Sequence, residues 1–343
     1  MVASNPIIPR GEPYDWPDPG RRPHPAIAAI VTTSSRLDWV LFLALGVIWG
    51  SSYLFIKVGL DAGLSPFTLV MLRLVIGFAL LATIVAAARE PLPRDARTYG
   101  HLIVMSVLNM ALPFVLITSA EQTLDSALAA TLAAAIPLVV IPVAAVTLRT
   151  EPITPNKVIG VLVGFVGVAI LVGLDPATLA QREPDAELAL VAATISYAIG
   201  GVYARRNIHG LRPMIPAVFQ VGFALAIVTV LAFLFEHPLE TPMRPDTLLA
   251  VVWLGLLGSG IAYLAFFRLL NRWGVTRTAL VAYLIPVVGI ILGGAVLHEA
   301  IDGRLLAGAA LILGGIVLVN RREGFGITLR RRTPTAVADA ELG

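Results

Sequence analysis

The sequence predicts an all-α, polytopic membrane protein of ten transmembrane helices, built from two inverted five-helix repeats. Three observations predict this fold: the composition, the placement of basic residues, and an internal repeat. Hydrophobic residues make up 57% of the 343 residues and charged residues only 14%, whereas soluble domains usually carry about 25% charged residues. Because an apolar helix of about 20 residues crosses the hydrocarbon core of a bilayer, ten apolar stretches predict ten spans.

The apolar stretches are separated by short polar breaks, so we expect no soluble domain between them. Ser65 and Thr154 each precede a proline, which is typical of a helix entry, and Asp246 and Asp302 are predicted N-caps. The expected spans are residues 39–60, 66–88, 99–120, 124–148, 156–174, 187–204, 215–235, 247–267, 277–297 and 304–320.

Both ends of the chain differ from the apolar part. Residues 1–37 hold seven prolines and no long apolar run, which is typical of a disordered, solvated segment. Residues 321–343 form a short basic segment. We therefore expect two cytoplasmic tails that flank one repeat at residues 38–174 and a second at residues 186–320.

Lysine and arginine residues are distributed unevenly between the two sides of the predicted spans. Of the 25 such residues, two lie within spans, three lie on one side, and the remaining twenty lie on the other. Loops rich in lysine and arginine stay in the cytoplasm. This distribution predicts that both termini are cytoplasmic, in an inner or plasma membrane of the bacterial type.

An internal repeat relates spans 1–5 to spans 6–10. Ile136-Pro137 in the fourth span is followed by Glu151, and Ile285-Pro286 in the ninth span is followed at nearly the same spacing by Glu299. Glycines recur nine and sixteen residues after each of these glutamates. Because each unit has five spans, the second copy must be upside down relative to the first. Inverted repeats are typical of alternating-access carriers whose site lies near the midplane.

Longer segments of both halves carry a resemblance to a known family. The segments are WGSSYLFIK (49–57), SPFTLVMLRLVIG (65–77), PFVLITSAEQTLDSALAATLAAAIP (113–137), EPITPNKVIGVLVGFVGVAILV (151–172), SYAIGGVYARR (196–206), ALVAYLIPVVGIILGGAVLHE (279–299) and GRLLAGAALILGGIVLV (303–319). Through them, residues 40–320 resemble two EamA-type domains of the drug/metabolite transporter superfamily. The resemblance implies ten helices and the export or exchange of small metabolites, amino acids or drugs. The second half departs from it at Tyr197, where such domains often have tryptophan, and at Gln220, where the first half has Arg73.

Arg73 is the sharpest candidate for a functional residue. It lies seven residues into the second span, about 10 Å deep at 1.5 Å per residue. Charged residues inside a membrane usually face a cavity or a partner. The alternative is a structural anchor that reaches back to the membrane surface.

Other polar and aromatic residues within the spans are also candidates for the substrate pathway. Trp49, Tyr53 and Lys57 are spaced by four residues and share one face of a helix, although Lys57 is equally suited to reach lipid headgroups. The others can line a pathway or make hydrogen bonds and packing contacts between helices: Asn109, Tyr197, Gln220, Ser259, Tyr263 and Tyr283.

Two prolines and two acidic residues complete the set of predictions. Pro137 and Pro286 interrupt equivalent spans, so each is expected to be a hinge or a static kink. Glu121 and Asp125 lie between the third and fourth spans. They are expected to be solvated charges, with cation attraction or proton binding as the alternative.

The leading functional hypothesis is a secondary transporter. A Walker-type phosphate loop is missing from the sequence, cysteine is absent and the five histidines are scattered, so we expect no cofactor and no metal. The expected partners are the lipid bilayer and a small-molecule solute, with either a coupled proton or a counter-solute, and no nucleic acid. The alternatives are a polytopic membrane-embedded enzyme and a passive channel, and both differ from a carrier in lacking saturable counterflow.

Overall fold

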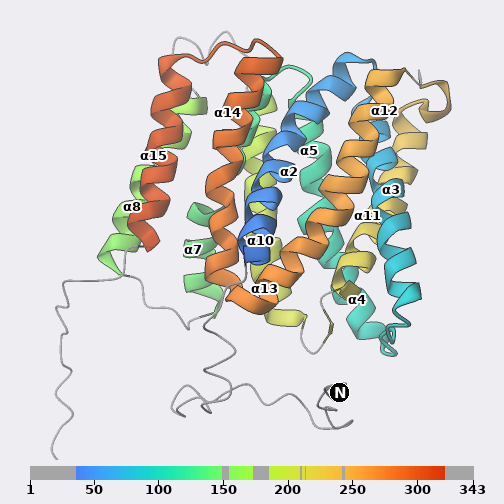
Figure 1. The fold of residues 1–343 in the computed structure, drawn as a ribbon. Coiled ribbons are helices and arrows are strands. Elements are labelled where there is room, and N and C mark those ends of the chain that lie inside the picture. Colours follow the sequence, from blue (N-terminus) through green and yellow to red (C-terminus); the bar gives the residue numbers. More distant parts are fainter. Residues whose placement is uncertain are drawn as a thin grey trace, which may run out of the picture.

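The computed structural model describes residues 36–148, 154–172, 185–208, 211–212, 214–241 and 244–320. Every secondary-structure element in these ranges is a helix (Figure 1), so the predicted all-α class is confirmed. The predicted tails lie outside the described residues, except that the first helix begins at Arg36. Glu151 also lies outside the described residues.

The described residues of the first half of the chain form seven α-helices and one π-helical segment. They are α2 (Arg36–Asp61), α3 (Pro66–Ala87), α4 (Ala96–Ser106), the π segment η1 (Val107–Ala111), α5 (Leu112–Ala120), α6 (Ser126–Ala133), α7 (Ile136–Leu148) and α8 (Pro155–Val172).

The described residues of the second half repeat this pattern with a further π segment and two short 3-10 helices. Its elements are α10 (Asp185–Asn207), α11 (Met214–Phe235), the 3-10 helix η2 (Pro238–Glu240), α12 (Pro245–Val252), the π segment η3 (Trp253–Ile261), α13 (Ala262–Ala279), the 3-10 helix η4 (Leu280–Tyr283), α14 (Leu284–Val296) and α15 (Gly303–Asn320).

Ten apolar helical segments among the described residues correspond to the ten predicted spans. Six are long and apolar enough to cross a membrane: Arg36–Asp61, Pro66–Ala87, Ala96–Ala120, Asp185–Ala204, Met214–Phe235 and Pro245–Phe266. Four are shorter apolar helices: Ser126–Val140, Pro155–Leu171, Val281–Val296 and Gly303–Val319. Lipid suits their many exposed large apolar side chains, such as Leu162, Phe233 and Ile291, because the hydrocarbon core is as apolar as they are.

The boundary between the eighth and ninth spans differs from the prediction. A polar break was expected at residues 268–276, but α13 continues without interruption to Ala279. Arg268 and Arg272 are one helical turn apart and both bond Asp38 of α2, at 3.2 Å and 3.0 Å. Arg268 and Arg272 therefore lie on one face of a continuous helix.

The predicted helix entries are partly correct. Asp302 caps α15, since its side chain accepts a hydrogen bond from the Leu305 N–H at 2.7 Å. Asp246 is not an N-cap, because α12 begins one residue earlier and Arg244 takes the cap position. Ser65 is the N-cap of α3, but its hydroxyl makes no capping hydrogen bond.

The contacts between helices follow the inverted repeat. The second and seventh spans pack on each other as α3 and α11, and the fifth and tenth as α8 and α15. The first span contacts the ninth as α2 and α14, and the sixth contacts the fourth as α10 and α7. Figure 1 shows that α2 rises from the lower end of the bundle to the upper end, whereas α15 descends. The two halves are thus interleaved around a pseudo-two-fold axis, as in inverted-repeat transporters.

Both repeats interrupt their helices at equivalent places. The π segments η1 and η3 lie in the third and eighth spans. Pro137 and Pro286 lie in the first turns of α7 and α14, directly after a break following α6 and after η4 respectively. The sequence did not indicate the π segments, which often occur at functional sites.

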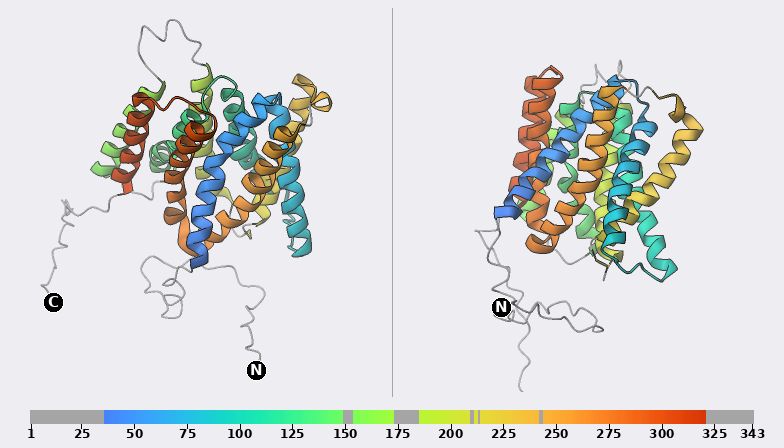
Figure 2. Two further views of the ribbon diagram at one scale, coloured as in Figure 1. Left: turned by 45° about the horizontal axis from the view of Figure 1, so that its top comes forward. Right: turned by 45° about the vertical axis from the view of Figure 1, so that its right-hand side comes forward.

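The α8–α15 pair stands at one side of the bundle (Figure 2) and packs backbone to backbone. A Cβ added to Gly315 would lie 2.5 Å from the Gly160 carbonyl oxygen and 2.8 Å from the Gly164 nitrogen. Small residues allow such close approach of membrane helices. Gly160 and Gly164 therefore lie in a close contact between α8 and α15.

Gly315→Val is therefore expected to lower the thermal stability of the detergent-solubilised protein, since overpacking costs about 1–3 kcal/mol. Gly314→Val is the matched control, because a Cβ at Gly314 would meet nothing within 4 Å. Equal melting temperatures for the two variants would contradict the backbone contact.

Candidate functional site

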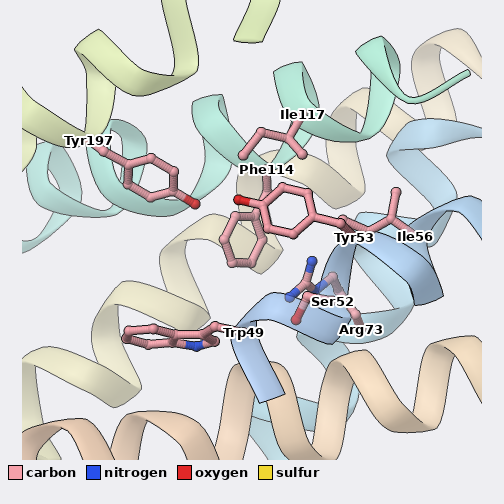
Figure 3. A pocket seen from close by; sticks show the side chains of 8 residues that line it. All are labelled: Trp49, Ser52, Tyr53, Ile56, Arg73, Phe114, Ile117 and Tyr197. Carbon is pink, nitrogen blue, oxygen red and sulfur yellow. The ribbon is translucent and has the colours of Figure 1, made fainter. Parts of the chain in front are cut away.

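A small cavity lies inside the bundle between α2, α3, α5 and α10 (Figure 3). Its volume is about 50 Å³, enough for a few water molecules. The lining residues come from both repeats: Trp49, Ser52, Tyr53, Ile56, Arg73, Phe114, Ile117 and Tyr197. The cavity therefore lies where the inverted repeat predicts a binding site.

Among the described residues that line this cavity, Arg73 is the one that carries a charge. Its side chain is buried at 4% exposure. Nε donates a hydrogen bond to Ser259 Oγ at 3.2 Å, and the guanidinium carbon lies 4.2 Å from the ring centroid of Phe114. In the described part of the chain, no carboxylate lies within ion-pair distance of Arg73. The structure thus holds a buried cation that retains donors for a ligand.

One face of α2 provides half of the cavity wall. Trp49, Ser52, Tyr53 and Ile56 follow the three- and four-residue spacing of a helical face, and all four line the cavity. The Trp49 Nε1–H donates to the carbonyl oxygen of Gly258 at 3.3 Å. Since Gly258 lies in η3, the π segment ties this wall to the second half.

Three predicted residues of the second half lie directly behind the cavity. Ser259 in η3 is fully buried and accepts the hydrogen bond from Arg73. The Tyr263 ring meets Trp49 edge to face at 6.0 Å. Gln220 Nε2 lies 3.4 Å from the Tyr263 hydroxyl, to which it donates. Ser259 and Tyr263 contact lining residues directly, and Gln220 contacts Tyr263.

Three other predicted residues lie elsewhere. Lys57 does not line the cavity, and its ammonium group donates to the carbonyl oxygens of Glu121 and Leu124, at 2.9 Å and 3.4 Å. Asn109 lies in η1 against Gly200 of α10, which is a helix–helix contact. Tyr283 ends η4 and packs against the hydrophobic core.

Several lining residues were not identified as candidates from the sequence. Ser52 and Ile56 carried a signal, since they continue the helical face of Trp49 and Tyr53. Phe114 and Ile117 carried none, because an apolar residue in an apolar helix does not reveal which way it faces. Only the position of Arg73 in three dimensions identifies Phe114 as part of the site.

Glu121 corrects the expectation of a solvated charge. It follows α5 in the connection to α6, and its exposure is 0%. Asp125, four residues later, is exposed as expected. An acidic residue of a loop, which its sequence position suggests is solvated, is therefore enclosed by neighbouring helices in the fold.

Carboxylates join the two halves at the upper end of the bundle in Figure 1. Glu236, after α11, accepts hydrogen bonds from the N–H groups of Phe67 and Thr68 at 3.0 Å and 2.7 Å, and from the Thr68 hydroxyl at 2.7 Å. Glu299 accepts from the N–H groups of Ser126 and Ala127 at 2.7 Å and 2.9 Å. Each caps the start of a first-half helix, where an anion is favourable.

Ion pairs join the two halves at the lower end. The Asp38 side chain is 1% exposed and bonds Arg268 and Arg272 of α13. Arg212 bonds Glu90 at 2.7 Å. The cavity therefore lies between two sets of contacts, one at each end of the bundle, and each set links first-half to second-half residues. We call the contacts of Glu236 and Glu299 the upper closure, and those of Asp38 and Glu90 the lower closure.

Comparison with known proteins gives consistent matches over most of the chain. The profile of the EamA-like transporter family matches residues 38–173 and 186–321. The "Uncharacterized transporter YoaV" of Bacillus subtilis is 24% identical over 277 residues, which cover 80% of this chain and 94% of that protein. The "Probable amino-acid metabolite efflux pump" of Salmonella typhimurium is 27% identical over 312 residues, covering 87% and 98%.

The fold is also found in a solved crystal structure. The TM-score is 0.61 at 23% sequence identity, and the match covers 84% of this chain and 99% of the other. At this identity the likeness concerns the fold alone.

Proposed function

Because the chain belongs to the EamA-like transporter family, we propose that it is a secondary transporter which exports or exchanges small carboxylate-bearing metabolites by alternating access. The observation that carries the proposal is Arg73, a buried cation that faces a cavity and has no carboxylate partner among the described residues. A buried charge is costly unless it is paired. A carboxylate of the solute supplies that partner.

The chemistry of the cavity suits a small amphipathic solute. The guanidinium of Arg73 can bind a carboxylate through two parallel hydrogen bonds. Tyr53 and Tyr197 point their hydroxyl groups toward the cavity (Figure 3), where they can bond further polar groups of the solute. Trp49 and Phe114 offer apolar walls. Amino acids combine these features, and one relative carries the name "Probable amino-acid metabolite efflux pump".

Alternating access is supported by the size of the cavity and its two closures. A volume of about 50 Å³ is smaller than an amino acid, so the site must widen to admit its solute. The upper contacts of Glu236 and Glu299 and the lower contacts of Asp38 would then open in turn. We assign the equivalent breaks before Pro137 and Pro286 as the hinges. The distribution of lysine and arginine supports a cytoplasmic location of both termini.

Counterflow in proteoliposomes tests this function. Vesicles loaded with an unlabelled amino acid are expected to take up the same labelled amino acid transiently and saturably. The decarboxylated amine of the same side chain is the matched control and is expected not to exchange, because it cannot pair with Arg73. The amines and amino acids differ only in the group that the proposal invokes.

Three results would contradict the proposal. Equal exchange of the amine would remove the role of the carboxylate. Uptake without saturation or counterflow would indicate a channel. Conversion of the solute without movement across the bilayer would indicate a membrane enzyme.

A further inference from the structure

Glu121 stands out among the buried groups that the proposed solute site does not use. It lies between α5 and α6, at the end of the bundle where Glu236 and Glu299 join the two halves. Its exposure is 0%, and neither Oε1 nor Oε2 has a hydrogen-bond partner among the described residues. Most buried polar atoms in folded proteins have such a partner, so this carboxyl group requires an explanation.

Lys57 does not provide the missing partner. Its ammonium group donates to the backbone carbonyl oxygen of Glu121 at 2.9 Å rather than to the carboxylate. An ionised carboxylate without hydrogen bonds is costly to bury, whereas its neutral form is far less so. The geometry of the closed structure therefore suits a protonated Glu121.

The ionisable groups that act on Glu121 come from three separate parts of the chain. Lys57 and Tyr53 lie on α2, Arg73 lies on α3, and Glu299 follows α14. Burial has the largest effect and raises the pKa of the Glu121 carboxyl group well above its usual value; the charge of Lys57 opposes this, and that of Glu299 adds to it. Asp125, in the same connection, shares the influence of Glu299 and Lys57.

Tyr53 connects this group to the solute cavity. It lines the cavity, and both Glu121 and Arg73 lie within its electrostatic reach. Lys57 follows Tyr53 by one helical turn on the same face of α2. A change of charge at Glu121 thus changes the electrostatic potential at the residues that surround the solute.

We propose that Glu121 is the proton-binding site that couples solute movement to a proton gradient. The inference rests on the proposed transport function. In the closed structure the carboxyl group holds its proton. When the upper end opens, the Glu121 carboxylate takes up a proton from that side, and the carrier without solute closes with the proton in place. When the lower end opens, water reaches Glu121 through the cavity that Tyr53 lines, the carboxylic acid releases the proton to the lower side, and the carboxylate is left beside Lys57. Solute bound at Arg73 then moves to the upper side in exchange for that proton.

Glu121→Gln separates coupling from transport, because glutamine has the shape of the neutral acid but carries no exchangeable acidic proton. Wild-type proteoliposomes are expected to accumulate solute against its gradient when a pH gradient is imposed, and a protonophore should abolish this accumulation. Glu121→Gln is expected to lose gradient-driven accumulation and to retain counterflow at equal pH. Asp125→Asn neutralises an exposed carboxylate nearby and is expected to retain both activities.

The outcomes distinguish the two proposals. Absence of counterflow in the wild type would overturn the proposed function itself. Counterflow without any response to a pH gradient would overturn only the role of Glu121. The same holds if Glu121→Gln accumulates solute like the wild type, or loses counterflow while keeping its thermal stability.

Thermal stability against pH gives a test that needs no transport. A carboxyl group whose pKa is raised in the folded state makes its full contribution to stability at pH values below its pKa in the unfolded chain, near 4.5. That contribution is lost as the pH rises through the pKa of the group in the folded state. The melting temperature of the wild type minus that of Glu121→Gln should therefore decrease as the pH rises from 5 upward. A difference that is independent of pH would contradict a buried, protonated Glu121.

Discussion

Replacing Arg73 with alanine is expected to reduce counterflow of carboxylate solutes by about thirtyfold or more at subsaturating concentration, since a hydrogen-bonded charge contributes about 2 kcal/mol to binding. Melting temperature should not fall, because the substitution removes a buried charge that has no carboxylate partner among the described residues. The measurement is initial-rate counterflow of the purified variant in proteoliposomes of matched protein content.

Two further variants make this test specific. Arg73→Lys keeps the charge but loses the planar fork of donors, so an intermediate rate is expected. Arg97→Ala removes an exposed arginine near the start of α4 and should leave the rate unchanged. Wild-type exchange by Arg73→Ala would show that Arg73 is a structural anchor.

Replacing Glu236 with alanine is expected to destabilise the protein by about 2–3 kcal/mol, because hydrogen bonds to a charged group are the strong ones. Its carboxylate accepts three hydrogen bonds at the start of α3, from Phe67 N–H, Thr68 N–H and the Thr68 hydroxyl. The loss should appear as a lower melting temperature in detergent.

Two further variants serve as controls for Glu236→Ala, and they are expected to lower the melting temperature less or not at all. Thr68→Val removes one of the three hydrogen bonds and should have a smaller effect of about 1 kcal/mol. Glu240→Ala removes an exposed carboxylate in the adjacent 3-10 helix and should have none. Equal melting temperatures for Glu236→Ala and Glu240→Ala would rule out the closure at this end.

The helices were predictable because apolar length and basic-residue placement act locally along the chain. The fold class and the ten segments followed from apolar length, and the inverted repeat followed from the recurrence of proline, glutamate and glycine at matching spacings. The helical continuation of α13 did not, since residues 268–276 mix polar with apolar residues. Arg268 and Arg272 of this segment bond Asp38 of α2, some 230 residues away in sequence. Tertiary contacts decide such boundaries.

The candidate site was predictable to the extent that single residues carry unusual chemistry. An arginine within an apolar span is such a residue, and so are the aromatic residues of one face of α2. The burial of Glu121 was not predictable, because nothing in its own segment shows that α2, α3 and the segment after α14 enclose it. Likewise Lys57 has the right spacing to share the face of α2 with Trp49 and Tyr53. Its ammonium group nevertheless donates a hydrogen bond to the carbonyl oxygen of Glu121 and does not line the cavity.

Labelling of a single cysteine at Ser52 tests the central claim most directly, that the Arg73 cavity opens alternately to both sides. The natural sequence contains no cysteine, so Ser52→Cys introduces one thiol into the cavity wall. Asp61→Cys and Arg97→Cys, exposed at opposite ends of the bundle, should each react with a membrane-impermeant thiol reagent from one side only. Ser52→Cys is expected to react from either side, in right-side-out and in inverted vesicles, and to be protected by solute. Reaction from one side alone, or from neither, would contradict alternating access.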